Sequence, residues 1–330
     1  MNKSLILLLT VLFLIPQAAP AEWYKGNTHT HTVNSDGGAA PDEVARWYKE
    51  NGYQFLVITD HDFVTNVDGL NSILAAEEKF LVIPGEEVSD GAVAKDGRDV
   101  PIHLNAINIR KTIPAAGGKG VTETLQADVR AINAAGGLCQ INHPNFGWAL
   151  GVEDMAAAGD YKIFEIANAH PYVNNAGGGG MISTEALWDS LLTRGKKVFG
   201  VASDDAHGYR IFNERQANPG RAWVWVKADR LAAEDIVSAM SRGDFYCSTG
   251  VTLKDIKAEE KALTVEIAAS ARGDVKYTVY FIGRGGKVLS TVYDNPAVYK
   301  ITGKEDYVRA KVVDSNGLIA WTQPLFISEK

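Results

Sequence analysis

Short apolar runs alternate with amphipathic stretches from about residue 25 to residue 250, and this alternation limits the folds open to the chain. Each run is short and rich in Val, Ile and Phe, which is typical of buried parallel strands. The runs cover residues 55–59, 80–83, 103–109, 138–142, 161–167, 197–202 and 222–227. Repeated strand–helix alternation over this length predicts an α/β fold.

The amphipathic stretches between the runs predict helices. Residues 41–50 start with Pro and two acidic residues and stop at Asn51-Gly52, which are signals for a helix start and a helix end. Residues 121–135, 184–193 and 232–242 follow the same pattern, with glycine after each. With seven or so strands and no dinucleotide-type glycine fingerprint, the pattern favours a barrel over an open sheet.

The pattern of the sequence changes after residue 250, from strand–helix alternation to short β-type runs only. Short β-type runs at 263–268, 276–281, 287–292, 307–313 and 318–326 are separated by Arg-Gly-Gly, Asn-Pro and Asn-Gly turns. They predict a small all-β, sandwich-like domain over residues 251–330. This segment contains no His and no Cys. We therefore expect no catalytic metal there, and the sequence leaves the partner of this domain open.

The N-terminus has the three parts of a secretory signal peptide. Lys3 supplies the basic region, residues 5–15 are mostly apolar, and Ala19-Pro20-Ala21 matches a small-x-small cleavage pattern. The apolar stretch is too short for a comfortable transmembrane helix, which needs about 20 residues. The sequence predicts a signal peptide over residues 1–21, a hydrolase barrel over 22–250, no stable membrane span after cleavage, and a periplasmic or secreted protein.

Charge and cysteine content narrow the function further. The chain has 40 Asp+Glu against 33 Lys+Arg, a formal net charge of −7, whereas general nucleic-acid binding needs a basic face. Only two cysteines are present, Cys139 and Cys247, and both lie in apolar, strand-like runs. An oxidising compartment permits a disulfide between them. Their apolar setting favours buried free thiols.

Histidines and acidic residues gather where the predicted strands end. Carboxyl ends of barrel strands meet on one face, so residues that follow them converge. Six of the seven His are involved, because His103 opens a strand and the others follow strand ends. The residues after strand ends are His29, His31, Asp60, His61, Asp62, Glu86, Glu87, His143, Asp204, Asp205 and His207.

The spacing within this set predicts a metal centre. Residues i and i+2 of an extended segment share a face, so His29 and His31 can bind one ion together, as can Asp205 and His207. Imidazole and carboxylate ligands without a nearby Cys suit Zn, Mn or Fe far better than Ca.

In order along the chain, the motifs that carry these residues are His29-Thr-His31, Ser35-Asp36-Gly37, Thr59-Asp60-His61, Pro84-Gly-Glu86, Asn142-His143-Pro144 and Ser203-Asp-Asp205-Ala-His207. Together they resemble the successive motifs of the PHP (polymerase and histidinol phosphatase) superfamily. The resemblance implies a distorted (β/α)7 barrel with a trinuclear site and hydrolysis of phosphate esters by a metal-bridging hydroxide. An exported member with a β domain after the barrel also resembles a branch of carbamate-ester hydrolases, although the C-terminal domain itself lies outside the core family.

The resemblance further implies a ligand set for two or three divalent ions (Zn, Mn or Fe). By family roles, the first ion is held by His29, His31, Glu86 and Asp205, the second by Glu86, His103 and His143, and the third by Asp36, His61 and His207. Asp36 stands where some relatives have His. Glu86 is preferred to Glu87, although the sequence alone leaves both open, and the two-residue step to His207 selects Asp205 over Asp204.

Several further residues are expected near the mouth of the barrel. Arg210 and Arg221 are placed to bind a substrate phosphate, although ion pairing elsewhere fits them equally well. Glu165, Asn168 and His170 follow the strand residues 161–163, and we expect them to line the mouth or support the ligands, with Asn168 taken as substrate-binding. For Trp148 and Tyr172, stacking on an aromatic or sugar group and ordinary rim packing both fit the sequence.

These observations predict an enzyme, a metal-dependent phosphoesterase acting on a small or medium phosphate ester. Three ions, three carboxylates and one hydroxide leave a formal charge of about +2, which attracts an anionic substrate. Two other functions stay open. One is a carboxyl or carbamate ester hydrolase on the same metals, and the other is a non-catalytic, metal-dependent binding protein.

Overall fold

The computed structural model describes residues 21–75, 79–270 and 273–327, and it is a mixed α/β structure with an added β-rich region. The N-terminal elements are β1 (Glu22–Asn27), α1 (Pro41–Glu50), β2 (Phe55–Ile58), α2 (Asp68–Leu74), β3 (Leu81–Val93), β4 (Asp99–Ile107), α3 (Val121–Ala134), β5 (Leu138–Ile141), α4 (Val152–Ala157), β6 (Ile163–Asn168), α5 (Thr184–Thr193), β7 (Phe199–Ser203), β8 (Trp223–Ala228), α6 (Ala233–Arg242) and β9 (Phe245–Ser248). The predicted signal peptide lies outside the described residues except for Ala21.

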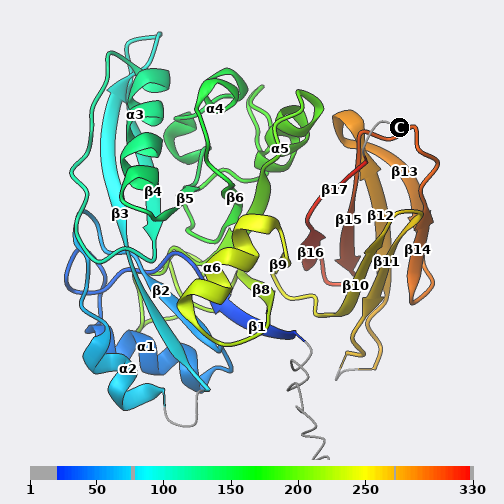
Figure 1. The fold of residues 1–330 in the computed structure, drawn as a ribbon, viewed down its shortest axis with the longest axis horizontal. Helices are drawn as coiled ribbons and strands as arrows, with labels where there is room; N and C mark the ends of the chain where they lie inside the picture. The colour runs from blue at the N-terminus through cyan, green and yellow to red at the C-terminus, as the bar shows by residue number, and fades with distance from the viewer. Residues whose placement is uncertain (1–20, 76–78, 271–272, 328–330) are drawn as a thin grey trace, which may run out of the picture.

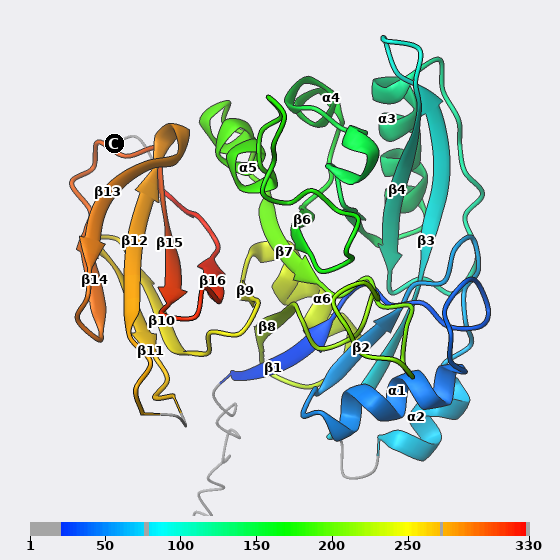
Figure 2. The ribbon, with the colours of Figure 1, turned by 180° about the vertical axis from the view of Figure 1, so that it is seen from behind.

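The C-terminal elements are β10 (Leu253–Glu259), β11 (Ala262–Ile267), β12 (Tyr277–Gly283), β13 (Lys287–Val292), β14 (Ala297–Lys300), β15 (Tyr307–Asp314), β16 (Ile319–Thr322) and β17 (Leu325–Phe326). Both views place them to one side of the α/β part (Figure 1 and Figure 2). β10, β11 and β14 form a separate three-stranded sheet.

One large sheet runs through both regions in the order β13-β12-β15-β16-β9-β8-β1-β2-β3-β4-β5-β6-β7. β1, β2 and β3 pair in parallel, and so do β5, β6 and β7. β4 is antiparallel to both β3 and β5. The six other strands therefore run in the same direction, and their carboxyl ends share one edge.

The expectation that all seven runs are parallel strands is wrong for two of them. β4 returns beside β3 as the second arm of a hairpin, and β8 is antiparallel to β1. The hairpin turn holds Asp96-Gly97, a dipeptide that favours tight hairpins, with Gly97 at φ 85°. β3 reaches this turn by running on to Val93, ten residues beyond the predicted end of the run at 80–83.

The helices at 41–50 and 184–193 were predicted with the observed bounds, and the two others differ by one residue at one end. Among the helices that the described ranges contain, none is long and apolar enough to cross a membrane.

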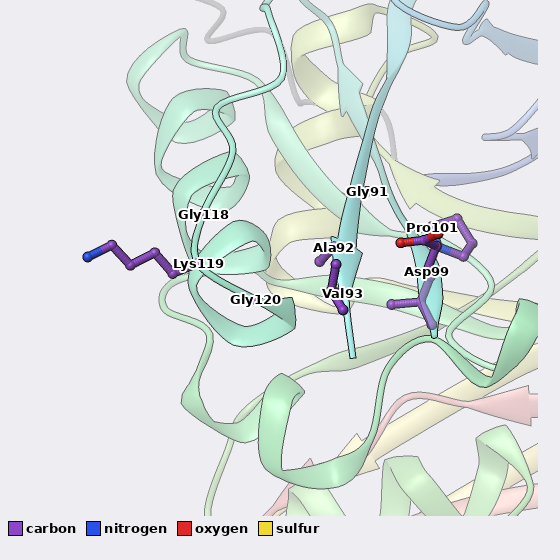
Figure 3. A pocket seen from close by; sticks show the side chains of 9 residues that line it. Gly91, Ala92, Val93, Asp99, Pro101, Gly118, Lys119 and Gly120 are labelled. Atoms are coloured by element: carbon purple, nitrogen blue, oxygen red, sulfur yellow. The ribbon is translucent and has the colours of Figure 1, made fainter. Parts of the chain in front are cut away.

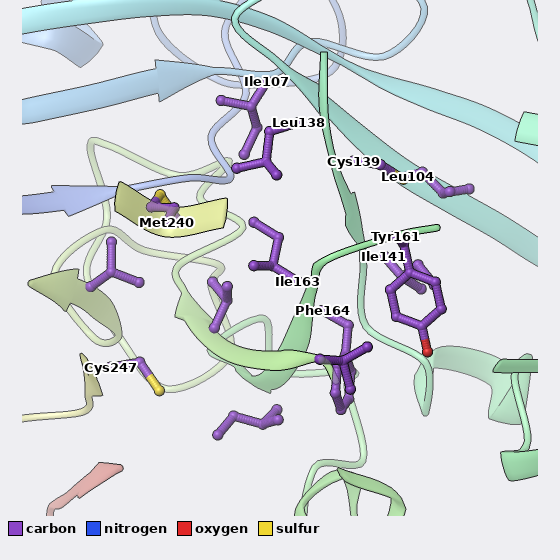
Figure 4. Close-up of a cluster of buried hydrophobic side chains, with 14 of the residues drawn as sticks. Leu104, Ile107, Leu138, Cys139, Ile141, Tyr161, Ile163, Phe164, Met240 and Cys247 are labelled. Atoms are coloured by element: carbon purple, nitrogen blue, oxygen red, sulfur yellow. The ribbon is translucent and has the colours of Figure 1, made fainter. Parts of the chain in front are cut away.

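The main hydrophobic core lies between the N-terminal sheet and its helices (Figure 4). Cys139 and Cys247 are both buried there, free and on different sides of the cluster drawn, which confirms the prediction of buried free thiols. Burial raises the pKa of both thiols. A buried, protonated thiol packs as a small apolar side chain.

The C-terminal strands are attached to the α/β part by polar contacts as well as by the shared sheet. β7 is an edge strand, and the side-chain amide of Gln323 pairs with both backbone groups of Gly200 on it, at 2.8 Å each. Gln323 thus takes the place of a neighbouring strand and protects the edge.

A buried ion pair forms the second attachment. Arg309 on β15 donates from Nε and Nη2 to the carboxylate of Asp189 on α5, at 2.9 and 2.6 Å. Glu185 accepts from the same guanidinium at 2.9 Å, and the ring of Trp188 lies 4.8 Å from it. Arg309 is fully buried, so removing its charge would leave Asp189 without its counter-charge.

We therefore expect Arg309→Met to lower the free energy of unfolding by about 3–5 kcal/mol, the cost of breaking a buried pair. Arg284→Met is the matched control, because Arg284 pairs with Asp306 in the same region but is largely exposed, and we expect a cost of about 0–1 kcal/mol. Denaturant unfolding of both variants checks this. Equal losses would contradict the assignment of Arg309 as the anchor.

Candidate metal centre

The segments that follow β1 and β7 meet at the carboxyl edge of the sheet. The backbone NH of His31 donates to Ala206 O at 3.0 Å, and the NH of Asp205 donates to His29 O at 3.1 Å. These bonds bring the side chains together. Asp205 Oδ1 lies 3.4 Å from His29 Nε2 and 3.2 Å from His31 Nε2, and the two Nε2 atoms are 3.2 Å apart. The predicted pairing of His29 and His31 on one face is present.

Two of the residues that deliver side chains to this edge have unusual backbone. Asp205 has φ 50° and His143 has φ 23°, in the left-handed region that residues other than glycine seldom adopt. Strained conformations of this kind gather at functional sites, where the surrounding structure enforces them. Here hydrogen bonds from Asn168 to Asp205 and from the His143 NH to Glu165 hold them in place.

The carboxylate of Glu87 lies at the middle of the centre and faces five imidazoles. Its Oε2 approaches ring nitrogens of His29, His31 and His61, and its Oε1 approaches those of His103 and His143, all at 3.1–3.4 Å. Burial would raise the pKa of Glu87, but the imidazoles, His29 first, hold it well below its ordinary value. The carboxylate is therefore ionised and fully buried.

The choice of Glu86 as a ligand is corrected by this geometry. Adjacent residues of a strand point to opposite faces, so only one of the two carboxylates can face the imidazoles. Glu86 points the other way and accepts a hydrogen bond from the NH of Ile113 at 2.5 Å. Its Oε2 has no hydrogen-bond partner, and burial raises the pKa of Glu86 to about 7.

A more open group lies beside Glu87. Asp36 Oδ1 is 3.3 Å from His207 Nε2, and Asp36 Oδ2 is 3.8 Å from His61 Nε2. Asp36 is largely exposed, whereas His29 and His31 are fully buried. The structure thus brings together all the predicted ligands except Glu86, and it adds Glu87.

The donor chemistry of these residues fits divalent cations. Four overlapping groups offer ligand atoms that lie within 4.8 Å of one another. They are His29, His31 and Asp205; His29, Glu87 and His143; His61, Glu87 and His103; and His31, Asp36, His61 and His207. Imidazole nitrogens this close to one another and to carboxylates, without Cys, match the ligands of Zn, Mn or Fe.

Glu165 supports the centre from behind. Its Oε1 lies 2.8 Å from His29 Nδ1, and its Oε2 accepts from the NH of His143 at 2.6 Å. A carboxylate on Nδ1 keeps the proton there and leaves Nε2 free as a ligand, an arrangement typical of metal-binding histidines. The sequence allowed Glu165 either to line the mouth of the barrel or to support the metal ligands. Glu165 is fully buried, so it supports the ligands.

The substrate-binding role predicted for Asn168 is not supported. Asn168 is 1% exposed, and its amide nitrogen donates to Glu165 Oε2 at 2.8 Å and to Asp205 Oδ2 at 3.1 Å. Both amide hydrogens are used, so Asn168 positions two carboxylates.

The two predicted arginines differ. The guanidinium of Arg221 donates to Gln216 O and Asn218 Oδ1, at 2.8 and 2.9 Å, and to Asn213 O, which ties down a loop. These bonds engage its guanidinium, and its substrate role stays a prediction. Arg210 is exposed and has no hydrogen bond or ion pair with any described residue. Its role as a phosphate contact stays a prediction.

Two buried aspartates shape the loops and were not singled out as supports by sequence reasoning. Asp204 accepts from the backbone NH groups of 220, 221 and 222 and from the Tyr48 hydroxyl at 2.7–2.9 Å. Asp60 accepts from Thr32, Ser35 and Thr65 at 2.6–2.8 Å. Both lie next to a ligand in sequence, which was the one signal available.

A surface hollow on the β3–β4 hairpin lies outside this centre (Figure 3). Its lining residues are Gly91, Ala92, Val93, Asp99, Val100, Pro101, Gly118, Lys119 and Gly120. The lining holds no imidazole, and the side chain of Lys119 points away from the hairpin. This hollow therefore lacks the ligand groups that gather at the strand ends.

Comparison with known structures agrees with this architecture. A two-domain protein of Bacteroides vulgatus, described as containing a predicted PHP-like metal-dependent phosphoesterase, is 16% identical with a TM-score of 0.51, covering 94% of this chain and 97% of that one. The chain shares its fold with that protein over nearly the whole length of both. No model of a known protein family and no curated protein matches the sequence.

Two other solved structures are more distantly similar to the chain. One is a metal-dependent phosphoesterase of Bifidobacterium adolescentis, described as putative, with 16% identity and a TM-score of 0.43, covering 65% of this chain and 94% of that one. The other is an amidohydrolase of Chromobacterium violaceum with bound sulfate and no metal, with 18% identity and a TM-score of 0.39, covering 55% of this chain and 87% of that one.

Substitution of the two adjacent glutamates separates their roles. Glu87→Gln should lower metal affinity at least about 10–100-fold, because removing a supporting group alone has that effect. Glu86→Gln should leave metal affinity unchanged. It should also raise the free energy of unfolding more at about pH 8 than at about pH 5.5, because a buried carboxyl with a pKa of about 7 is charged in the fold only at the higher pH.

Metal titration and denaturant unfolding at the two pH values check both statements. Loss of metal from Glu86→Gln with retention by Glu87→Gln would contradict the assignment.

Proposed function

We propose that this protein is an exported, metal-dependent hydrolase that cleaves phosphate esters. The observation that carries the proposal is the buried, ionised carboxylate of Glu87 among five imidazoles, with Asp205 and Asp36 beside it. The fold shared with the B. vulgatus protein, whose description names the same class, supports it. Its site would hold two or three ions of Zn, Mn or Fe.

The finer architecture is part of the proposal. The pairing of Thr30 with Ala206 after β1 and β7 supports closure of the sheet as a distorted (β/α)7 barrel. The two sheets of the C-terminal strands support a sandwich over residues 251–330. The signal peptide predicted over residues 1–21 supports a periplasmic or secreted protein.

Bound divalent ions would lower the pKa of water from 15.7 toward about 7 and offset the charge that develops on a phosphoryl group. Three facing carboxylates contribute a formal charge of −3, so two ions leave about +1 and three leave about +3. Either value favours an anionic substrate over a neutral one. The substrate is therefore proposed as a small phosphate ester.

The chain's own residues orient this chemistry. Glu165 fixes the proton of His29 on Nδ1, and Asn168 holds the Asp205 carboxylate with its second oxygen turned toward the two Nε2 atoms. Arg210, three residues beyond His207, has its guanidinium free for the non-bridging phosphate oxygens.

A substrate panel tests the proposal. We expect the protein, stripped by chelation and reloaded with Mn, Zn or Fe, to hydrolyse a phosphomonoester or phosphodiester only when metal is present. His29→Ala with His31→Ala should lower kcat/KM by more than tenfold, about 1.4 kcal/mol of barrier, while circular dichroism stays unchanged. Arg284→Met, far from the centre in the C-terminal region, is the control and should keep full activity.

The same panel includes aryl carboxyl and carbamate esters. Turnover of those esters alone, insensitive to inorganic phosphate, would replace the phosphoesterase with the carboxyl or carbamate ester hydrolase. Metal binding without hydrolysis of any ester would contradict an enzymatic function and favour the binding protein.

A further inference from the structure

Exposed apolar side chains follow three of the histidines at or beside the centre, each at a spacing of two residues. Val33, Phe63 and Tyr172 each lie two residues after a histidine, and all three are exposed. Tyr172 has the greatest exposure, 70%. An exposed aromatic ring beside a buried polar centre has no role in the hydrophobic core. Exposed apolar groups gathered at a concave or reactive site indicate binding of an apolar partner group.

The rings of Phe146, His170 and Tyr172 form a continuous aromatic wall. The His170 ring lies 5.3 Å from the Tyr172 ring and 6.2 Å from the Phe146 ring, both edge-to-face. The backbone NH of Tyr172 donates to His170 Nδ1 at 3.3 Å, and this bond holds the His170 ring next to Tyr172.

This wall stands directly on the metal centre. The Phe146 ring is 5.3 Å from the ring of His143, and the His170 ring is 5.5 Å from the ring of His207. A phosphoryl group bound at this centre would therefore place its ester substituent next to the wall. His170 is the one histidine of the seven that belongs to none of the groups of ligand atoms.

The chemistry of the wall selects the substituent. Aromatic faces stack on planar rings, and the wall carries no carboxylate, ammonium or guanidinium to pair with a charged substituent. We propose that the organic half of the substrate is an uncharged aromatic ring that stacks on Tyr172, which makes Tyr172 a specificity-determining residue. The inference rests on the proposed function, because it assumes that the phosphoryl group binds at the metal centre.

Phosphonates test the inference without turnover. Phenylphosphonate and methylphosphonate share the anionic group and differ in the ring. The difference between their affinities for the metal-loaded protein, measured by calorimetry, is therefore what the ring adds. Stacking of this kind corresponds to about a two- to tenfold gain in affinity. We expect phenylphosphonate to bind more tightly by that factor. Tyr172→Ala should abolish the preference, and Tyr172→Phe should keep it.

Tyr293→Ala is the matched control. Tyr293 is a tyrosine with 76% exposure in the turn between β13 and β14, away from the centre, and its loss should change neither affinity. The same variants are then assayed with an aryl and an alkyl phosphate whose leaving alcohols have matched acidity. Tyr172→Ala should raise KM for the aryl ester alone.

The outcomes separate the two claims. Equal affinity of the wild type for both phosphonates, or a preference that survives Tyr172→Ala, would overturn the aromatic wall while metal-dependent hydrolysis stands. An equal loss for both ligands in Tyr172→Ala would show a merely structural role and would also overturn it. Failure of both phosphonates to bind the metal-loaded protein would contradict the proposed function, and the inference would fall with it.

Discussion

The fold depends on holding one ionised carboxylate where water cannot reach it. Glu87 is fully enclosed, and the groups that face it are imidazoles and the amide of Asn142. Burying an unpaired carboxylate costs several kcal/mol. The positive charge that offsets it must come either from protonated imidazoles or from cations that the imidazoles and the carboxylate bind together. Divalent ions satisfy Glu87, Asp205 and the imidazoles together. We regard the whole polar interior as built around that requirement.

The rest of the molecule keeps the ligands in register. Six strands of one direction bring ligand-bearing segments to one edge, and the β3–β4 hairpin extends past that edge to carry Glu87 and His103 over it. β7, which leads to Asp205, ends the sheet, and the C-terminal strands protect its edge through Gln323. Arg309 holds α5 from the same side. The C-terminal region is therefore part of the frame of the centre.

Much of the fold and of the ligand set could be predicted from the sequence because the signals are local. Apolar runs gave most strands, glycine stops gave the helix ends, and the two-residue steps placed His29 beside His31 and chose Asp205. The choice between Glu86 and Glu87 could not be predicted, because it depends on which face of β3 turns toward the imidazoles. That in turn is fixed by pairing with β4, a long-range contact. The supporting role of Asn168 was hidden for the same reason, since one of its partners, Asp205, lies 37 residues away in the chain.

A crystal structure of the metal-loaded protein, with anomalous scattering recorded at the metal edge, tests the central claim most directly. The account predicts at least two anomalous peaks, one of them within about 2.0–2.2 Å of a Glu87 oxygen and of an imidazole nitrogen of His29 or His143. Anomalous density away from Glu87, or none at the strand ends while the protein retains metal in solution, would contradict it.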